Sequence, residues 1–155
     1  MFAVIRIRGS VDLNSEKKKT LEFLRLDRVN HLVLVPQTAS IKGMVKKVED
    51  TVTFGEINDE TIGKLIEKRG RMQGDKIFGT AGLKKAAGKA KDFKELGLAL
   101  LQGRVSLKEL GLKPVFRLRP PRKGFERKGI KRNFSIGGAA GYRGTEINKL
   151  IEKMI

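Results

Sequence analysis

Hydrophobic and polar positions alternate at the start of the chain. Residues 2–8, FAVIRIR, place apolar side chains up to and between two arginines, and Gly9 follows them, which is typical of a β-strand. The run 31–36, HLVLVP, is continuously apolar up to its proline, as in a buried strand, and residues 51–57, TVTFGEI, alternate again. The pattern therefore predicts three strands within the first 57 residues.

Two helices are predicted between these strands. Asn14 or Ser15 can cap a helix that runs to about Leu26. Thr38 is expected to cap the second helix, whose apolar residues recur at the i, i+3, i+4, i+7 spacing of a core-facing stripe. These residues are Ile41, Met44, Val45 and Val48. The order strand, helix, strand, helix, strand predicts an α+β protein with one small sheet and helices packed on it.

Beyond residue 57 the pattern becomes mainly helical. The residues expected to cap these later helices are Asn58 or Asp59, Asp92, the pair Ser106 and Glu109, and Thr145. Val115 and Phe116 predict one further short strand. The last helix carries its apolar side chains on one face, at Ile147, Leu150, Ile151 and Met154. We expect that helix to dock on the protein's own fold rather than on another protein.

A dense run of cations reaches from Arg117 to Arg132, with the sequence RLRPPRKGFERKGIKR. Eight of its sixteen residues are Lys or Arg, and Glu126 is the only acid. Its prolines and glycines disfavour regular structure, so we predict an extended arm that contributes nothing to the core. We also expect the arm to lack fixed structure until a polyanion neutralises it. The alternative interpretation is an ordinary solvated loop.

A second basic stretch runs from Lys68 to Lys91. It holds eight Lys or Arg, one acid and five glycines, and is predicted to be flexible, with a plain mobile loop as the alternative. Its glycines do not form a phosphate-binding loop, because no Gly-Lys-Ser/Thr follows them at the required spacing. The sequence therefore gives no reason to expect nucleotide binding.

The formal net charge of +17 and the sequence pI near 10.4 point to a nucleic acid as the partner. The excess of cations rises along the chain. Residues 1–57 hold ten basic and seven acidic side chains (+3), residues 58–112 hold twelve and seven (+5), and residues 113–155 hold twelve and three (+9). No apolar run approaches the roughly 20 residues that span a bilayer, so no membrane partner is expected. The absence of cysteine and of a signal-peptide pattern favours a cytoplasmic protein.

Residues suited to catalysis are scarce. The chain has one histidine and no cysteine, and His31 opens a buried-type strand where a packing role is expected. The acidic pairs Glu49 with Asp50 and Asp59 with Glu60 lie at helix ends, where carboxylates interact with the helix dipole. We predict no catalytic residue, metal, cofactor or small-molecule substrate.

The candidate RNA-binding residues are the cations of the two basic stretches together with one aromatic side chain that a base can cover. They are Arg117, Arg119, Arg122, Lys123, Phe125, Arg127, Lys128, Lys131, Arg132, Arg69, Arg71, Lys76, Lys84, Lys85, Lys89 and Lys91.

Two long segments carry a family resemblance. In residues 20–57 it rests on TLEFLRL, on the Asn30-His31 start of the second strand, on PQTASIKGMVKKV and on the short closing strand. This segment resembles the large-subunit ribosomal protein thirty family. Residues 121–154, PRKGFERKGIKRNFSIGGAAGYRGTEINKLIEKM, resemble the C-terminal part of its archaeal and eukaryotic branch, called L-seven in eukaryotes. The lack of a long basic tail before Met1 favours the archaeal type.

The resemblance implies a ferredoxin-like sheet of three strands, with the first strand central and two helices on one face. It also implies a division into a core, residues 1–57, and a helical, basic C-terminal extension, residues 58–155. The implied function is that of a structural constituent of the large ribosomal subunit in the cytoplasm. Its partners would be large-subunit ribosomal RNA, the nearby 5S RNA and neighbouring ribosomal proteins. The alternative is a free RNA chaperone or regulatory RNA-binding module.

Overall fold

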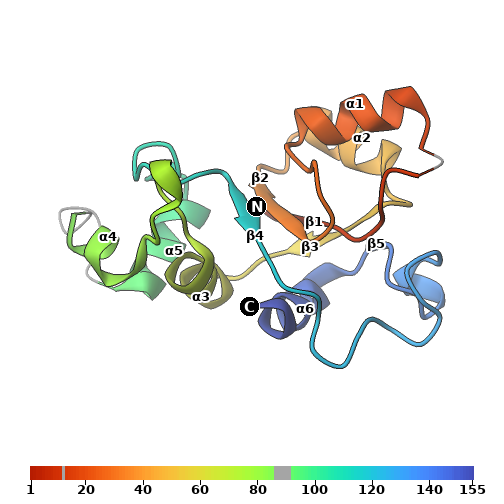
Figure 1. The fold of residues 1–155 in the computed structure, drawn as a ribbon. Helices are drawn as coiled ribbons and strands as arrows, with labels where there is room; N and C mark the ends of the chain where they lie inside the picture. The colour runs from red at the N-terminus through yellow and green to blue at the C-terminus, as the bar shows by residue number, and fades with distance from the viewer. Residues whose placement is uncertain (12, 86–91) are drawn as a thin grey trace.

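A mixed sheet of five strands, in the order β4-β2-β1-β3-β5, organises the structure. The structure is a computed structural model and describes residues 1–11, 13–85 and 92–155. Its strands are β1 (Phe2–Arg6), β2 (His31–Val35), β3 (Val52–Glu56), β4 (Val115–Arg117) and β5 (Gly141–Tyr142). Its helices are α1 (Ser15–Phe23), α2 (Ala39–Lys47), α3 (Asp59–Arg69), α4 (Gly79–Lys85), α5 (Phe93–Leu101) and α6 (Ile147–Met154). Figure 1 shows helices on both sides of the sheet.

The centre of the sheet agrees with the sequence analysis. β1 lies between β2 and β3 and pairs antiparallel with both, so the implied central position of the first strand is confirmed. The short strand predicted at Val115 and Phe116 is confirmed as β4, whereas the implied sheet of only three strands is wrong. β4 pairs antiparallel with β2, and β5 pairs parallel with β3, so the later part of the chain adds one strand at each edge. These additions cover backbone N–H and C=O groups that a three-stranded sheet would leave unpaired.

Helices α1 and α2 cover one face of the sheet, as the resemblance implied (Figure 1). Val4 of β1 and Val33 of β2 point into this layer and pack with Leu21 of α1 and Val45 of α2. The predicted cap of α2 is confirmed, because the Thr38 hydroxyl accepts a hydrogen bond of 3.4 Å from the next turn of backbone.

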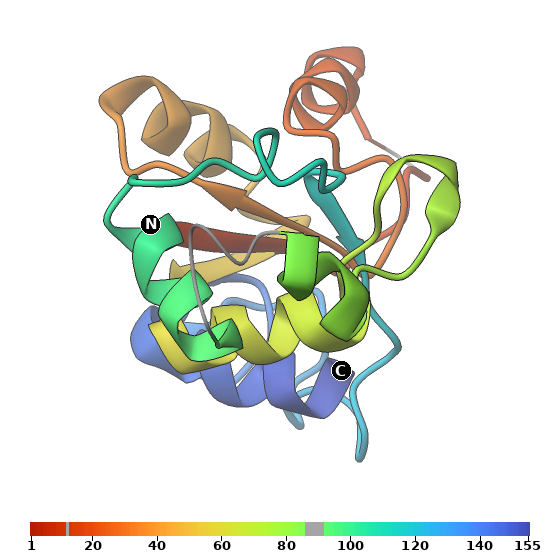
Figure 2. The same ribbon diagram turned by 90° about the vertical axis from the view of Figure 1, so that its left-hand side faces the viewer.

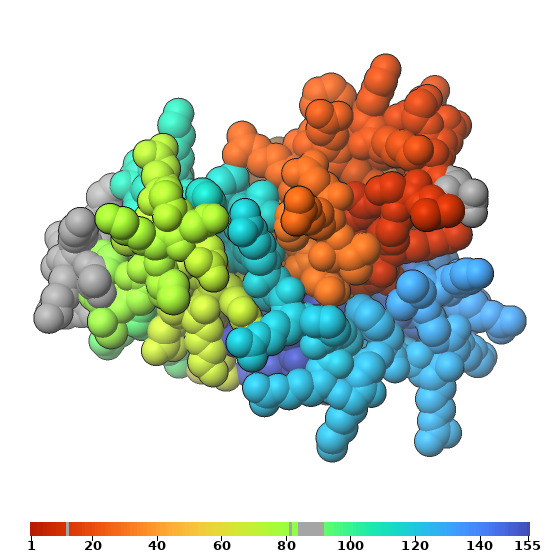
Figure 3. Space-filling model, viewed as in Figure 1, coloured from red at the N-terminus to blue at the C-terminus, as the bar shows by residue number. Residues whose placement is uncertain are grey.

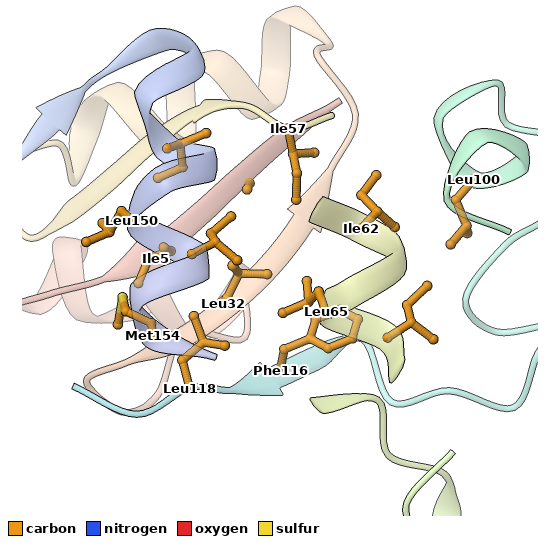
Figure 4. Close-up of a cluster of buried hydrophobic side chains, with 14 of the residues drawn as sticks. Ile5, Leu32, Ile57, Ile62, Leu65, Leu100, Phe116, Leu118, Leu150 and Met154 are labelled. Atoms are coloured by element: carbon orange, nitrogen blue, oxygen red, sulfur yellow. The ribbon is translucent and has the colours of Figure 1, made fainter. Parts of the chain in front are cut away.

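The opposite face is covered by α6 and α3, with α5 packed outside α3 (Figures 2 and 4). Ile5 of β1 and Leu32 of β2 are fully buried there, against Leu65 of α3 and Ile151 of α6. The expected docking of the last helix on its own fold is thus confirmed. Its start is displaced from the predicted Thr145 cap, because residues 144–146 form a 3-10 turn and the α-helix begins at Ile147.

Close contact between α3 and α5 depends on two glycines. A Cβ atom on Gly97 of α5 would lie 2.3 Å from the carbonyl oxygen of Asp59, and one on Gly63 of α3 would lie 2.8 Å from that of Phe93. The backbones therefore approach to a distance that only glycine allows. None of the described helices is long and apolar enough to cross a membrane.

His31 is expected to make the stability of the fold depend on pH. Burial lowers the pKa of this imidazole, and its Nδ1 atom has no hydrogen-bond partner among the described residues. Because the unfolded chain then binds the proton more readily than the native one, stability should be constant above the unfolded pKa of about 6.5 and fall below it. We expect the urea midpoint to drop between pH 7.5 and pH 5.5, and His31→Gln to reduce that drop. An equal drop in both proteins would contradict this assignment.

Candidate nucleic-acid interface

The first part of the arm, residues 117–132, is fixed to the body of the protein. Leu118 is 8% exposed and belongs to the core, and its amide donates to the Asn30 carbonyl over 3.0 Å. The amides of Arg119 and Arg122 donate to the carbonyls of Met154 and Lys153, each over 3.0 Å, and so cap the C-terminal end of α6. The expectation that this stretch contributes nothing to the core is therefore wrong. Figure 4 shows Leu118 beside Met154.

The rest of the arm is closed into a loop by hydrogen bonds with the glycine-rich segment that follows it. The Ala139 amide donates to Gly129 over 3.0 Å, and the Ala140 amide donates to Arg132 over 3.0 Å. Gly138 is required at this contact, because a Cβ atom there would lie 2.1 Å from the Arg132 carbonyl oxygen. The structure thus gives the arm a defined path, which differs from the expected lack of fixed structure.

A partly buried ion pair fixes the loop to the sheet. Arg143, which follows β5, has a side chain that is 2% exposed and donates to both carboxylate oxygens of Glu126, over 2.8 and 3.2 Å. It also donates to the Thr53 hydroxyl over 2.8 Å and to the Ala139 carbonyl over 2.9 Å, and its guanidinium lies 4.6 Å from the centre of the Phe134 ring. The single acid of the arm is therefore a structural anchor.

The cations of the arm point outward from this fixed backbone. All eight are exposed, while Phe125 is half-buried. They are Arg117, Arg119, Arg122, Lys123, Arg127, Lys128, Lys131 and Arg132. In Figure 3 the cyan and blue segments along the lower edge carry long side chains that project away from the molecule. The arrangement suits a partner that lies along this edge and presents many negative charges.

The two basic stretches meet at Asp75. Its carboxylate pairs with Lys113 and, over 3.6 Å, with Arg117, while the Arg71 guanidinium donates to the Asp75 backbone carbonyl over 2.8 Å. The hydrogen bond from Lys113 is the main reason why the pKa of Asp75 lies below its usual value. Lys113, Arg117 and Arg71 thus surround a single acidic residue and leave an excess of positive charge. We call these three cations and Asp75 the Asp75 cluster. Sequence reasoning selected Arg71 and Arg117 but missed Lys113.

Arg69 extends this positive region beside α6. It is half-buried and donates to the backbone carbonyl of Ile155 over 2.7 Å. Its pKa is lowered first by burial and then by the nearby charges of Arg119 and Arg71. These like charges repel one another, so a bound polyanion would relieve an unfavourable interaction.

The remaining predicted cations lie outside these groups. Lys76 is exposed next to the Asp75 cluster. Lys84 and Lys85 end α4, a helix in a stretch that was expected to be a flexible loop. The side chains of these two lysines, and Lys89 and Lys91 entirely, lie outside the described part of the structure.

Comparison with known proteins shows to which family the chain is related. The family described as "Ribosomal protein L30p/L7e" matches residues 2–52. A protein named "Large ribosomal subunit protein uL30" from Nanoarchaeum equitans is 46% identical over 155 residues, which cover 100% of this chain and 99% of the relative. Proteins of the same name from Methanococcus vannielii and Thermofilum pendens are each 48% identical, over 154 and 157 residues, with at least 99% of both chains covered. The chain belongs to the L30p/L7e family.

Family membership confirms the resemblance found in the sequence and extends over the whole chain. The archaeal relatives match the basic arm and α6 as well as the N-terminal strands, in agreement with the expected archaeal type. Proteins of the L30p/L7e family are structural rather than catalytic. Among the described residues, no group of three His, Asp or Glu is placed to hold a metal ion.

Sequence reasoning missed two lysines of the L30p/L7e chain that lie next to the arm. Lys149 and Lys153 are exposed on α6 and line the hollow that also contains Arg122 and Lys123. The signal was present in the sequence, because residues four apart share a face of a helix. The apolar face of α6 is the stronger pattern in the same residues, and it hides the basic one.

Proposed function

We propose that this chain is a structural constituent of the large ribosomal subunit, and that it binds and stabilises ribosomal RNA in the cytoplasm. The observation that carries this proposal is the identity of 46% to 48%, over essentially the full length, with proteins named as uL30 of the large subunit. The net charge of +17 and the exposed cations of the arm support it.

The RNA contacts are assigned to the exposed cations of the arm and to the Asp75 cluster. The folded body sets their positions, since Leu118 and Glu126 fix the arm to the core and to the sheet. Phosphate groups are the natural ligands, and arginine is suited to them because its planar fork can bridge two oxygens or stack on a base. Sequence-specific base recognition is not part of this proposal.

The same proposal includes a location close to the 5S RNA and contacts with neighbouring ribosomal proteins. It rests on the family resemblance. Chemical cross-linking of intact large subunits should join this chain to 5S RNA as well as to the larger RNA. Cross-links to the larger RNA alone would limit the proposal to that partner.

A free RNA chaperone or regulatory module is the competing function. Sedimentation in a density gradient at high magnesium separates the two, because a stoichiometric component stays with the large subunit and a chaperone remains near the top. We expect the chain to sediment with the large subunit. Its absence from that fraction would favour the chaperone.

Binding to ribosomal RNA should depend strongly on salt. If about six arm cations meet phosphates, with about 0.7 to 0.9 counterions released for each, log affinity should fall with log salt concentration at a slope of about −4 to −5. Filter binding or fluorescence anisotropy at several potassium chloride concentrations measures this slope. A slope near zero would show that the arm does not follow phosphates.

A further inference from the structure

A pocket of about 200 Å³ lies between the arm, Phe134 and α6. Its apolar surface comes from Phe125, Phe134 and Leu150, of which both phenylalanines are half-buried. Lys149 and Lys153 of α6 contribute exposed side chains to its edge. The pocket therefore combines aromatic walls with a basic rim.

Arg143 places a buried hydrogen-bond donor against this pocket. A guanidinium has five N–H groups. The hydrogen bonds to Glu126, Thr53 and Ala139 account for four of them. The fifth, on Nη1, has no partner among the described residues, although the side chain is 2% exposed and lines the pocket. A ligand that offers an acceptor would satisfy it.

The charge around the pocket is positive. Its lining includes four cations and two carboxylates. Glu126 is already paired with Arg143, and Glu146 is paired with Lys149 over 2.8 Å. Lys123 and Lys153 have no acidic partner in the described part of the chain. Two lysines are thus available at the rim for a negatively charged group.

A neighbouring surface hollow continues the basic rim. It shares Lys123, Lys149 and Lys153 with the pocket and adds Arg122. Its one carboxylate, Glu152, pairs with Lys64 of α3. An RNA backbone that follows this hollow would pass directly over the mouth of the pocket.

We infer that the pocket receives one unstacked base of the bound RNA, while the adjoining phosphates contact the lysine rim. Unpaired bases commonly stack on aromatic side chains and hydrogen-bond through their edges. A volume of about 200 Å³ is below the roughly 300 to 1,000 Å³ of pockets for drug-sized ligands, which suits a single ring system. Every base has a π-face and an edge acceptor for Arg143, so the site selects an unpaired position rather than a sequence.

This inference rests on the proposed function, since the RNA is taken to be ribosomal. The test uses the full chain and a fragment of large-subunit RNA that it protects from nuclease, with an abasic site introduced at one nucleotide after another. At one position, removal of the base should weaken binding to the wild-type protein by about 5- to 150-fold, the range found for base stacking. Binding to Phe125→Ala should be insensitive to the same removal. Phe23→Ala, at a 78% exposed position on α1, is the matched control and should behave as wild type.

A second measurement covers the case in which Phe125→Ala does not fold. Wild-type protein is irradiated with the same RNA fragment carrying 4-thiouridine, and cross-links should map to peptides that contain Phe125 or Phe134. If the protein binds the RNA but neither a base-dependent position nor such a cross-link is found, the inference is wrong. If the wild-type protein does not bind large-subunit RNA at all, the proposed function fails instead.

Discussion

Arg143→Ala is expected to destabilise the protein by about 3 to 5 kcal/mol, the usual cost of removing one partner from a buried ion pair. The lower end is more appropriate, because the Glu126 side chain is 29% exposed and regains some hydration. A loss of about 3 kcal/mol corresponds to a decrease of about 6 to 12 °C in Tm for a chain of this size. The variant should also be cut faster by proteases within the arm, since it loses the hydrogen bonds to Thr53 and Ala139.

Differential scanning calorimetry and limited proteolysis measure the two effects. Lys149→Ala is the matched control, because it breaks an ion pair with Glu146 whose lysine is 71% exposed, and such pairs contribute about 0 to 1 kcal/mol. If Arg143→Ala melts within 2 °C of wild type, the ion pair does not anchor the arm.

Replacing the eight cations of the arm with serine is expected to preserve the fold and to remove most of the RNA affinity. The altered residues are Arg117, Arg119, Arg122, Lys123, Arg127, Lys128, Lys131 and Arg132. All of these side chains are exposed, and the backbone amides that cap α6 remain. The loss of about six phosphate contacts should weaken binding on the order of a thousandfold at low salt and flatten the salt slope by about 4 to 5.

A smaller pair of variants separates local contacts from net charge. Serine at Arg127, Lys128, Lys131 and Arg132 removes four charges from the arm. Serine at Lys18, Lys19, Lys42 and Lys46 removes four from the exposed faces of α1 and α2. If the arm contacts RNA, the first variant should bind much more weakly than the second. Equal losses would mean that overall charge, rather than the arm, determines affinity.

Local signals were sufficient for much of the fold. The cap at Thr38 and the apolar face of α6 depend on residues within a few positions of each other, and both are present in the structure. β5 was missed because it has only two residues, Gly141 and Tyr142, in a glycine-rich run. Its pairing with β3 joins residues 88 apart in the sequence, as for Thr53 and Gly141, and no local pattern encodes such a contact.

In the candidate site, too, local features could be predicted and long-range contacts could not. The density of cations was enough to select the arm as the candidate site, because a run of charges can be read from the sequence without knowing which residues contact it. The roles of Leu118 and Glu126 were missed, since both lie in a strongly basic run and their partners come from elsewhere in the chain. Arg143 gave no signal in the sequence, where it is one arginine in a short loop.

The late position of α6 in the chain affects how the protein is synthesised. Ala3, Ile5 and Leu32 form an apolar sheet face whose cover includes this helix, and about 90 residues separate Ile57 from Ile147. At about 5 to 20 residues per second, translation takes roughly 5 to 18 s to supply that cover. During this interval α3 can cover only part of that hydrophobic face, while the densest stretch of cations emerges behind it. The part of the face that waits for α6 is therefore prone to aggregation until the last helix docks.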